Sequence, residues 1–252
     1  VITPIERKNR ARPTMLSIDI ETDEKANKIY SISLYDKDHA EVIVINNESM
    51  DDMTLEHATL VADEKDLLTT FMTRVREIDP DIIVGWNVID FDFKVIAKNC
   101  KLHNLHLALG RSDDAVHFRF ESSFFRDSHA SVKGRIILDG IQLLKSSFVK
   151  LDDYKLNTAA KHFLKDEKLI TQDDRFGIID RMYTEDPQKF IDYNLKDSRL
   201  VYDILIESGI YELTVQRSLL TGLHMDNVKA SIASFDSLYL RDLRRRGYVA
   251  PS

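Results

Sequence analysis

MLSIDIET, residues 15–22, is a short apolar run that ends in two carboxylates, Asp19 and Glu21. Side chains two apart on a β-strand point to the same face, so a strand here places both acids side by side at its C-terminal end. Adjacent like charges disfavour each other's ionisation unless a cation is present. Taken alone, such a pair is more often a polar strand end with solvated acids than a metal site, and the rest of the chain decides between these two interpretations.

The composition is that of a globular protein. The 252 residues are 43% hydrophobic and 31% charged, which fits one large domain, or one domain with an appendage, that can bury a full core. The net charge of −7 excludes a generally basic nucleic-acid binder. Two basic runs, ERKNRAR at residues 6–12 and RDLRRR at residues 241–246, are interpreted as solvated ends, with phosphate contact as the less common alternative.

Cysteine, glycine and hydropathy patterns exclude several other classes. A single cysteine, Cys100, excludes an internal disulfide and a cysteine-rich zinc site, and it fits an intracellular protein. The sequence shows no signal peptide and no apolar run long enough to cross a membrane, so no membrane partner is expected. The 8 glycines form no phosphate-cradling motif, which leaves nucleotide-binding folds little support.

The first part of the chain predicts strands. Strand-like runs cover residues 14–20, 28–35 and 40–45, and charged or polar turns separate them as in an antiparallel meander. Residues 46–60 are predicted to form a surface loop.

A helix and a buried strand follow. The helix is predicted from its N-cap Asp63 to about Asp79, because the apolar residues between them form one helical stripe. DIIVGWN, residues 81–87, is a continuous apolar run typical of a buried strand. A strand, a helix and a buried strand in this order indicate a parallel pairing within one sheet. A second helix is predicted over residues 89–103.

The second half of the chain is mostly helical by pattern. VHFRFESSFF, residues 116–125, predicts a β-hairpin inserted before a fifth strand at residues 135–138. Asp186 is a good N-cap and Pro187 a good first helical residue, so a long helix is predicted from there. Helical character continues to about Arg246. The sequence therefore predicts an α/β protein with helices packed on a sheet.

Acidic residues follow two of the predicted strands and recur on the late helix. Asp19 and Glu21 end the first strand, Asp92 follows the buried strand, and Asp197 lies one helical turn after Tyr193. In open α/β sheets, ligands bind beyond the carboxyl ends of the strands. Hard divalent cations prefer oxygen ligands, and two such ions about 3.5–4 Å apart catalyse phosphodiester hydrolysis. A tyrosine hydroxyl beside such a site could orient the attacking water.

Each of these residues also has a purely structural explanation. Asp92 could stabilise a helix N-terminus, and Tyr193 with Asp197 could be an ordinary exposed pair. Asn87 could be a turn residue, and Phe91 a core aromatic. Their joint occurrence in this order favours the metal-site interpretation.

Three segments resemble, in order, the three motifs of the DnaQ-like 3′–5′ exonucleases: SIDIET, GWNVIDFD and YNLKDS at residues 17–22, 85–92 and 193–198. Over residues 13–251 the chain resembles the proofreading exonuclease domain of family B DNA polymerases, and most of all the bacterial members. The likeness includes GRIILDGIQLLKSSF at residues 134–148 and RRRGYVAP at residues 244–251.

This resemblance implies a site with two divalent metal ions, Mg²⁺ or Mn²⁺. Asp19 matches the aspartate that bridges both ions, Glu21 and Asp197 match the acids that complete one metal site, and Asp92 matches a ligand of the second, partly through water. Tyr193 matches the tyrosine that positions the nucleophilic water. A related subfamily carries histidine five residues before the last aspartate, where this chain has an aspartate, so the tyrosine type is indicated.

The resemblance also implies contacts with a substrate. Lys145 resembles a family lysine near the scissile phosphate. Thr22, Asn87 and Phe91 match motif positions expected at the substrate groove.

The implied fold is ribonuclease H-like: a mixed five-stranded sheet with one antiparallel strand, flanked by helices, with a β-hairpin insertion and a helical C-terminal extension. We expect an extended lead-in over residues 1–13, an exonuclease domain over 14–207, and a helical segment over 208–252 that leads toward a polymerase palm domain. No polymerase motif of the D-x-x-S-L-Y-P-S type occurs, so the chain is expected to be one piece of a DNA polymerase.

The expected function is metal-dependent 3′–5′ hydrolysis of single-stranded or frayed DNA 3′ ends, next to the polymerase domain of the same parent chain. We expect a monomer in the bacterial cytoplasm, associated with the nucleoid. Two alternatives remain open at this point: a 3′–5′ exoribonuclease of the ribonuclease D type, and a non-catalytic module that binds strand ends.

Overall fold

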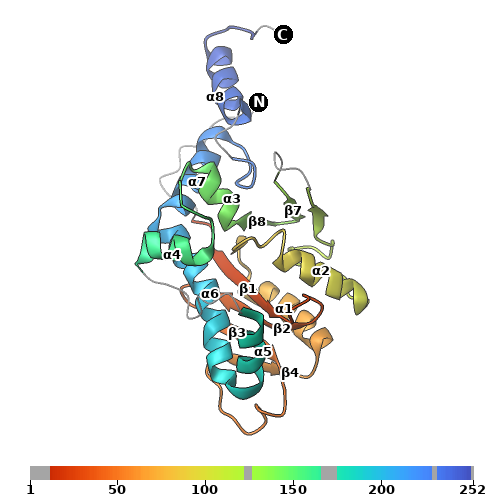
Figure 1. The fold of residues 1–252 in the computed structure, drawn as a ribbon. Helices are drawn as coiled ribbons and strands as arrows, with labels where there is room; N and C mark the ends of the chain where they lie inside the picture. The colour runs from red at the N-terminus through yellow and green to blue at the C-terminus, as the bar shows by residue number, and fades with distance from the viewer. Residues whose placement is uncertain (1–11, 122–126, 166–174, 229–231, 251–252) are drawn as a thin grey trace.

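The computed structural model describes residues 12–121, 127–165, 175–228 and 232–250 (Figure 1). Within these ranges, eight strands form one mixed sheet in the order β4-β3-β2-β1-β5-β8-β7-β6. The strands are β1 (Met15–Thr22), β2 (Ile29–Tyr35), β3 (Ala40–Ile45), β4 (Ala58–Val61), β5 (Ile82–Gly85), β6 (His117–Arg119), β7 (His129–Val132) and β8 (Arg135–Asp139). The α/β architecture predicted from the sequence is confirmed.

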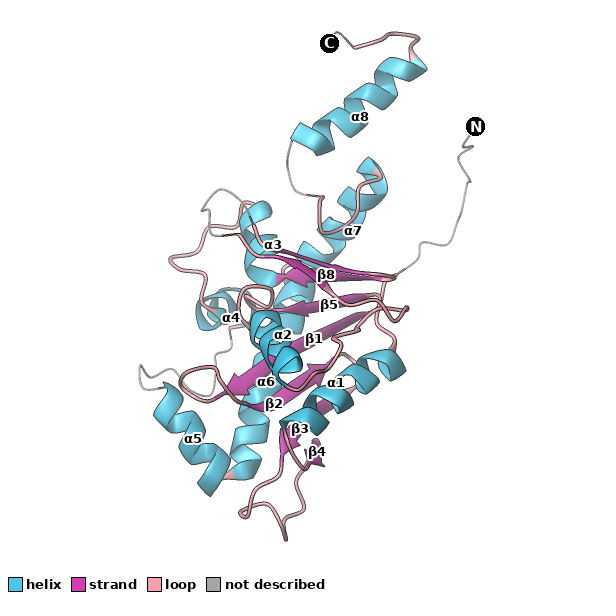
Figure 2. Cartoon of the chain, turned by 90° about the vertical axis from the view of Figure 1, so that its right-hand side faces the viewer, coloured by secondary structure: helices cyan, strands magenta, loops and turns pink. Residues whose placement is uncertain are grey.

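Helices cover both faces of the sheet. They are α1 (Glu64–Ile78), α2 (Asp92–Leu102), α3 (Gly140–Ser146), α4 (Leu156–Leu164), α5 (Arg175–Glu185), α6 (Pro187–Glu207), α7 (Ile210–Thr221) and α8 (Ile232–Arg245). Figure 2 looks onto the face that α1 and α2 cover, and α6 is seen behind the strands. Among the described helices, none combines the length and apolar character that a membrane crossing requires.

Strand β1 lies at the centre of the sheet and determines which side chains face which layer. It pairs antiparallel with β2 and parallel with β5, and among the five predicted strands only β2 runs against the others. Leu16, Ile18 and Ile20 alternate along β1 and are buried in the core beneath α1 and α2. Because strand side chains alternate between faces, Asp19 and Glu21 point to the opposite face, which α6 covers.

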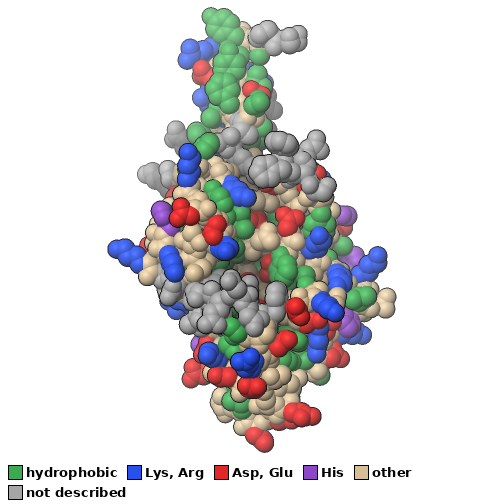
Figure 3. Space-filling view, in the orientation of Figure 1, with side chains coloured by type: hydrophobic (Ala, Val, Ile, Leu, Met, Phe, Trp, Pro, Cys, Tyr) green, Lys and Arg blue, Asp and Glu red, His purple; other side chains and the backbone are tan. Residues whose placement is uncertain are grey.

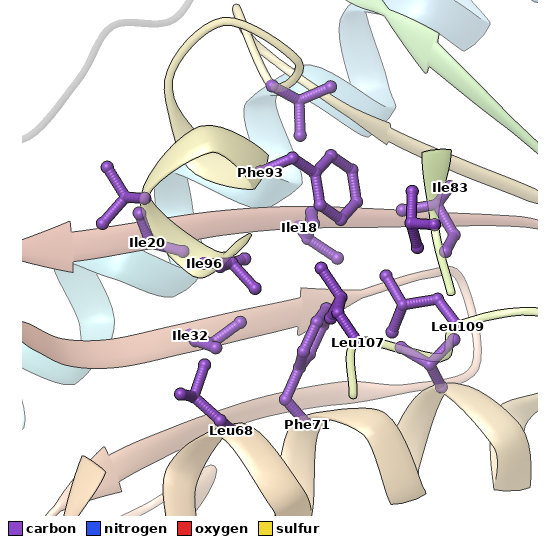
Figure 4. Close-up of a cluster of buried hydrophobic side chains, with 14 of the residues drawn as sticks. Ile18, Ile20, Ile32, Leu68, Phe71, Ile83, Phe93, Ile96, Leu107 and Leu109 are labelled. Atoms are coloured by element: carbon purple, nitrogen blue, oxygen red, sulfur yellow. The ribbon is translucent and has the colours of Figure 1, made fainter. Parts of the chain in front are cut away.

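The larger core lies between the sheet and helices α1 and α2 (Figure 4). Phe71 of α1 and Phe93 of α2 are fully buried against Ile18 and Ile32 of the central strands. Burial of each such side chain contributes about 1.5–3 kcal/mol. This layer therefore fixes the position of α2, whose first residue is Asp92.

The predicted helix ends are confirmed where capping residues define them. The Asp63 carboxylate accepts a hydrogen bond from the backbone N–H of Asp66 at 2.9 Å, and α1 ends at Asp79 in the left-handed conformation. Asp186 accepts a hydrogen bond from the N–H of Lys189, with Pro187 as the first residue of α6. These caps satisfy backbone groups that a helix terminus leaves without intrahelical partners.

The predicted number of five strands is too low. Residues 46–60 were predicted as a loop, but β4 begins within them and pairs parallel with β3 at the sheet edge. The predicted hairpin exists as β6 and β7, and its second arm, β7, follows the 116–125 run. Residues 122–125 of that run lie outside the described ranges. Strand β7 also pairs with β8, so the hairpin extends the sheet.

The predicted start of the second helix at residue 89 is three residues early. Asn87 has a positive φ of 61°, so the chain turns there before α2 begins. Val88 and Ile89 are buried in the core within this turn. Their apolar character is the same as that of a first helical turn, so the sequence pattern did not separate the two.

The C-terminal segment is helical as predicted and extends away from the sheet (Figure 1). Helix α8 has no buried residue, and hydrophobic side chains are exposed along it in Figure 3. Of the predicted lead-in, residues 1–11 lie outside the described ranges.

Candidate active site

Three carboxylates meet where β1 ends. The ligating oxygens of Asp19, Glu21 and Asp197 all lie within 4.8 Å of one another. Glu21 and Asp197 are buried, and Asp19 is half-buried. The alternation of β1 directs its two acids toward α6, and α6 directs Asp197 back toward β1. Helix α6 thus joins acids that are far apart in the sequence.

Asp92 lies next to the end of β1 and close enough to Glu21 to interact with it electrostatically. It is the first residue of α2, it is buried, and its Oδ1 accepts a hydrogen bond from the backbone N–H of Ile20 at 3.2 Å. Burial raises the pKa of Asp92 to about 8, and repulsion from Asp139 and Glu21 adds to the effect. Burial in a low-dielectric site disfavours the charged form of a carboxylate, so a proton or a cation is favoured there.

Asp139 is a further buried acid in this region, and it was not singled out in the sequence. It ends β8 and caps α3 by accepting hydrogen bonds from the N–H groups of Ile141 and Gln142, at 2.9 and 3.2 Å. Burial raises the pKa of Asp139 to about 6, and repulsion from Asp90 contributes. The signal in the sequence was an aspartate directly after an apolar strand, as at Asp19, but helix capping explains its position.

Tyr193 and Asn194 occupy the turn of α6 before Asp197. The Tyr193 side chain is buried in the core between β3, α5 and α6. Asn194 is fully buried; its Nδ2 donates to Asp19 Oδ2 at 2.9 Å, and its Oδ1 accepts from Ser31 Oγ at 2.8 Å. Asn194 was missed in the sequence because its partner on β2 lies 163 residues away.

The four predicted substrate residues lie on β1, on α3 and in the turn between β5 and α2. Asn87 and Phe91 lie in the turn between β5 and α2, and both are exposed, so Phe91 is not a core residue. Thr22 is buried at the end of β1, where its hydroxyl donates to the carbonyl of Asp23 at 3.0 Å. Lys145 lies on α3 with its Nζ 5.1 Å from the centre of the Tyr154 ring. Their contact with a substrate stays a prediction.

The donor set fits a divalent metal ion. Three carboxylates supply only hard oxygen atoms, and they are close enough for one ion to contact all of them. Like charges this close repel one another, and a bound cation offsets that repulsion because it attracts each carboxylate. We expect Asp19, Glu21 and Asp197 to hold such an ion, with Asp92 placed to contribute to a second.

Comparison with known proteins identifies the family. The family model "DNA polymerase family B, exonuclease domain" matches residues 1–159, more than half of the chain. This chain belongs to the family B DNA polymerase exonuclease domains. The predicted resemblance is confirmed.

Individual relatives of this exonuclease domain include bacterial, eukaryotic and archaeal polymerases. DNA polymerase II of Escherichia coli (strain K12) is 35% identical over 242 residues, which cover 94% of this chain and 30% of that protein. The DNA polymerase delta catalytic subunit of Schizosaccharomyces pombe is 29% identical over 54% of the chain and 13% of its own length. The DNA polymerase of Thermococcus kodakarensis is 26% identical over 94% of the chain and 14% of its own length. The chain therefore spans less than a third of the length of these relatives.

Proposed function

We propose that this domain is a metal-dependent 3′–5′ exonuclease that removes nucleotides from DNA 3′ ends. The observation that carries the proposal is the convergence of Asp19, Glu21 and Asp197 within 4.8 Å, in a chain of the family B exonuclease domains. The proposed cofactor is a pair of divalent ions, Mg²⁺ or Mn²⁺. The chemistry that such ions supply is Lewis acidity toward the attacking water and the departing 3′ oxygen.

The residues of the chain have distinct proposed roles in this reaction. Asp19, Glu21 and Asp197 hold one ion between β1 and α6, and Asp92 contributes to the second from the start of α2. The Tyr193 hydroxyl orients the attacking water. For this role, the water must lie within hydrogen-bond distance of the hydroxyl.

The proposed substrate is a single-stranded or frayed DNA 3′ end, because a terminal phosphodiester must reach buried carboxylates. Asn87 and Phe91 are exposed in the β5–α2 turn and are proposed to contact the terminal nucleotide, with Thr22 at the end of β1 lining the same groove. Lys145 is proposed to contact a phosphate. Binding through phosphates weakens as salt rises, so affinity for DNA should fall with ionic strength.

The relatives are named as DNA polymerases, and we propose that the domain proofreads for a polymerase domain in the same parent chain. We place the exonuclease domain at residues 14–207 and a connection toward the polymerase palm at residues 208–252. We further propose that it acts as a monomer in the bacterial cytoplasm, at the nucleoid.

A time course of 5′-labelled single-stranded DNA with Mg²⁺ tests the proposal. The expected result is a ladder that shortens from the 3′ end, absent with a chelator and absent in Asp19→Ala. A matched control is Asp38→Ala, which removes an exposed carboxylate paired with Lys37 and should cut like the wild type.

The same assay separates the two alternatives. RNA of the same sequence should be cut much more slowly than DNA, and faster cleavage of RNA would favour an exoribonuclease. DNA binding with no metal-dependent cleavage by the wild type would contradict the proposed activity and favour a binding module.

A further inference from the structure

Asn194 occupies a position on α6 that faces the acid group directly. It follows Tyr193 and lies three residues before Asp197, so it shares a helix face with that acid. Its side chain is fully buried between α6 and the strands β1 and β2. A buried amide must satisfy both its donor and its acceptor within the protein.

The amide of Asn194 has a defined orientation. The NH₂ group faces Asp19, with Nδ2 donating to Oδ2 at 2.9 Å. The Ser31 hydroxyl donates to the amide oxygen at 2.8 Å, which holds the opposite end of the amide. Ser31 lies opposite Glu21 in the β1–β2 register. A hydrogen-bonded chain therefore runs from β2 through α6 to Asp19.

This chain of hydrogen bonds acts on the one member of the acid group that has room to turn away. Asp19 is half-buried, whereas Glu21 and Asp197 are buried. Repulsion from the other two carboxylates favours rotation of Asp19 toward water, and the Asn194 amide opposes that rotation. The backbone of Asp19 is held as well, because Ser33 Oγ donates to its carbonyl at 3.3 Å.

We infer that Asn194 is a positioning residue that holds the Asp19 carboxylate ready for a divalent metal ion, with Ser31 fixing its amide. The inference rests on the proposed metal site. Residues that hydrogen-bond metal-ligating side chains typically change metal affinity by about 10–100-fold when they are removed. Asn194→Ala should therefore weaken metal binding by about 10–100-fold while the three carboxylates remain.

The test is a titration of the full chain with Mn²⁺ in the absence of DNA, with free Mn²⁺ measured by electron paramagnetic resonance. Asn194→Ala should shift the binding midpoint upward by about 10–100-fold. The matched control is Asn99→Ala: Asn99 is also fully buried, but its Nδ2 donates within its own helix to the carbonyl of Val95 at 3.1 Å. Asn99→Ala should leave the Mn²⁺ midpoint unchanged.

Cleavage of single-stranded DNA adds a second readout. At saturating Mn²⁺, Asn194→Ala should recover most of the wild-type rate, because the groups that touch the substrate are intact. A rate that stays equally low at every Mn²⁺ concentration would contradict a role in metal binding.

A milder variant keeps the test valid if Asn194→Ala does not fold. Ser31→Ala leaves the amide in place but removes its fixed orientation, so it should weaken Mn²⁺ binding less than Asn194→Ala and in the same direction. An unchanged midpoint in whichever variants are folded by circular dichroism would overturn the inference. If instead the wild type binds no Mn²⁺ and cuts no DNA, the proposed function itself fails.

Discussion

Carboxylates lie at both ends of the central strands, and their surroundings differ. At the end where β5 begins, Arg111 donates to Asp79 at 2.8 Å and to Asp81 at 3.0 Å, and Arg135 pairs with Asp79 at 2.9 Å. At the opposite end, carboxylates of β1 and α6 lie within 4.8 Å of one another, with two more buried acids at the ends of neighbouring elements. We call these the arginine-paired end and the acid end.

The two ends shift carboxyl pKa values in opposite directions. Hydrogen bonds from Arg111 lower the pKa of Asp79. Burial alone would raise the pKa of Asp81, but hydrogen bonds from Thr14 and Arg111 outweigh it and lower the pKa. At the acid end, burial and neighbouring carboxylates raise the pKa of Asp92 to about 8, and burial raises that of Asp139 to about 6.

This difference indicates what each end is for. Acids whose charge the chain neutralises with its own arginines stabilise the fold. A buried acid whose pKa is raised by burial and by other carboxylates is favoured to hold a proton, or to hold a cation when one is available. The comparison therefore predicts that substitutions at one end change chemistry and that substitutions at the other change stability.

The largest expected effect is on cleavage at the acid end. Asp197→Asn keeps the shape of the side chain but removes one of the three carboxylates proposed to hold a metal ion. Metal ions supply several kcal/mol of transition-state stabilisation, and each 1.4 kcal/mol is about tenfold in rate, so single-turnover cleavage should fall by about 1000-fold. Asp113→Asn, at a fully exposed acid, should leave the rate unchanged. An Asp197→Asn rate within tenfold of the wild type would contradict the assignment.

The next effect is on stability at the arginine-paired end. The buried Arg135 side chain donates to the carbonyl of Leu109 at 2.8 Å and to that of Pro80. Arg135→Met leaves these buried carbonyls without their donor, so the free energy of unfolding in urea should fall by about 3 kcal/mol. Arg76→Met, which removes an exposed pair with Asp113, should cost less than about 1 kcal/mol. If added metal restores the free energy of unfolding of Arg135→Met, the two ends are not independent of each other.

The pH dependence of stability should have opposite signs at the two ends. Asp92 has a pKa of about 8 in the folded protein and about 4 in the unfolded chain, so between these values the native state holds more protons and stability falls as pH rises. The lowered pKa values of Asp79 and Asp81 act in the other direction, and their stabilisation is lost as pH falls below about 4.

Asp92→Asn isolates the first of these effects. Without metal, the free energy of unfolding of the wild type should fall by roughly 3–4 kcal/mol between pH 5 and pH 8, because the folded state holds nearly one extra proton over most of this range and each pH unit counts for at most about 1.4 kcal/mol per proton. Asp92→Asn should remove this loss. Urea unfolding in the presence of a chelator measures the slope, with Asp113→Asn as the control. The same slope in Asp92→Asn and the wild type would show that Asp92 does not titrate as described.

The smallest expected effect is that of Tyr193→Phe. Loss of one hydroxyl that orients water should slow cleavage by about tenfold, the equivalent of about 1.4 kcal/mol, without shifting the Mn²⁺ midpoint. Tyr183→Phe is the matched control: its hydroxyl donates to the carbonyl of Ile45 at 2.9 Å in the same core cluster, away from the acids. A wild-type rate of cleavage in Tyr193→Phe would contradict the proposed role of the Tyr193 hydroxyl in orienting water.

Local patterns predicted the elements whose residues carry their own signals. The alternation of β1, the Asp63 cap and the Asp186-Pro187 start of α6 are all local. Strand β4 was missed because it is short and only partly buried, and its pairing comes from β3. The second hairpin arm was misplaced for a similar reason, since β7 is defined by its contact with β8.

The candidate site was predictable to the extent that its members end strands or recur at helical spacing. The sequence indicated that Asp19, Glu21 and Asp197 could converge, and the structure brings their oxygens together. Asn194 also has helical spacing from Asp197, but its role depends on contacts with Ser31 and Asp19, which lie far away in the sequence. Asp139 carried a signal, but its burial depends on neighbouring elements.

The most direct test of the difference between the two ends is the position of a bound metal. Crystals of the protein grown with Mn²⁺ would show it by anomalous scattering at the manganese edge. The account predicts a peak in contact with Asp19, Glu21 and Asp197, a second peak toward Asp92, and none beside Asp79 or Asp81. Mn²⁺ at the arginine-paired end, or no Mn²⁺ among the three carboxylates, would contradict it.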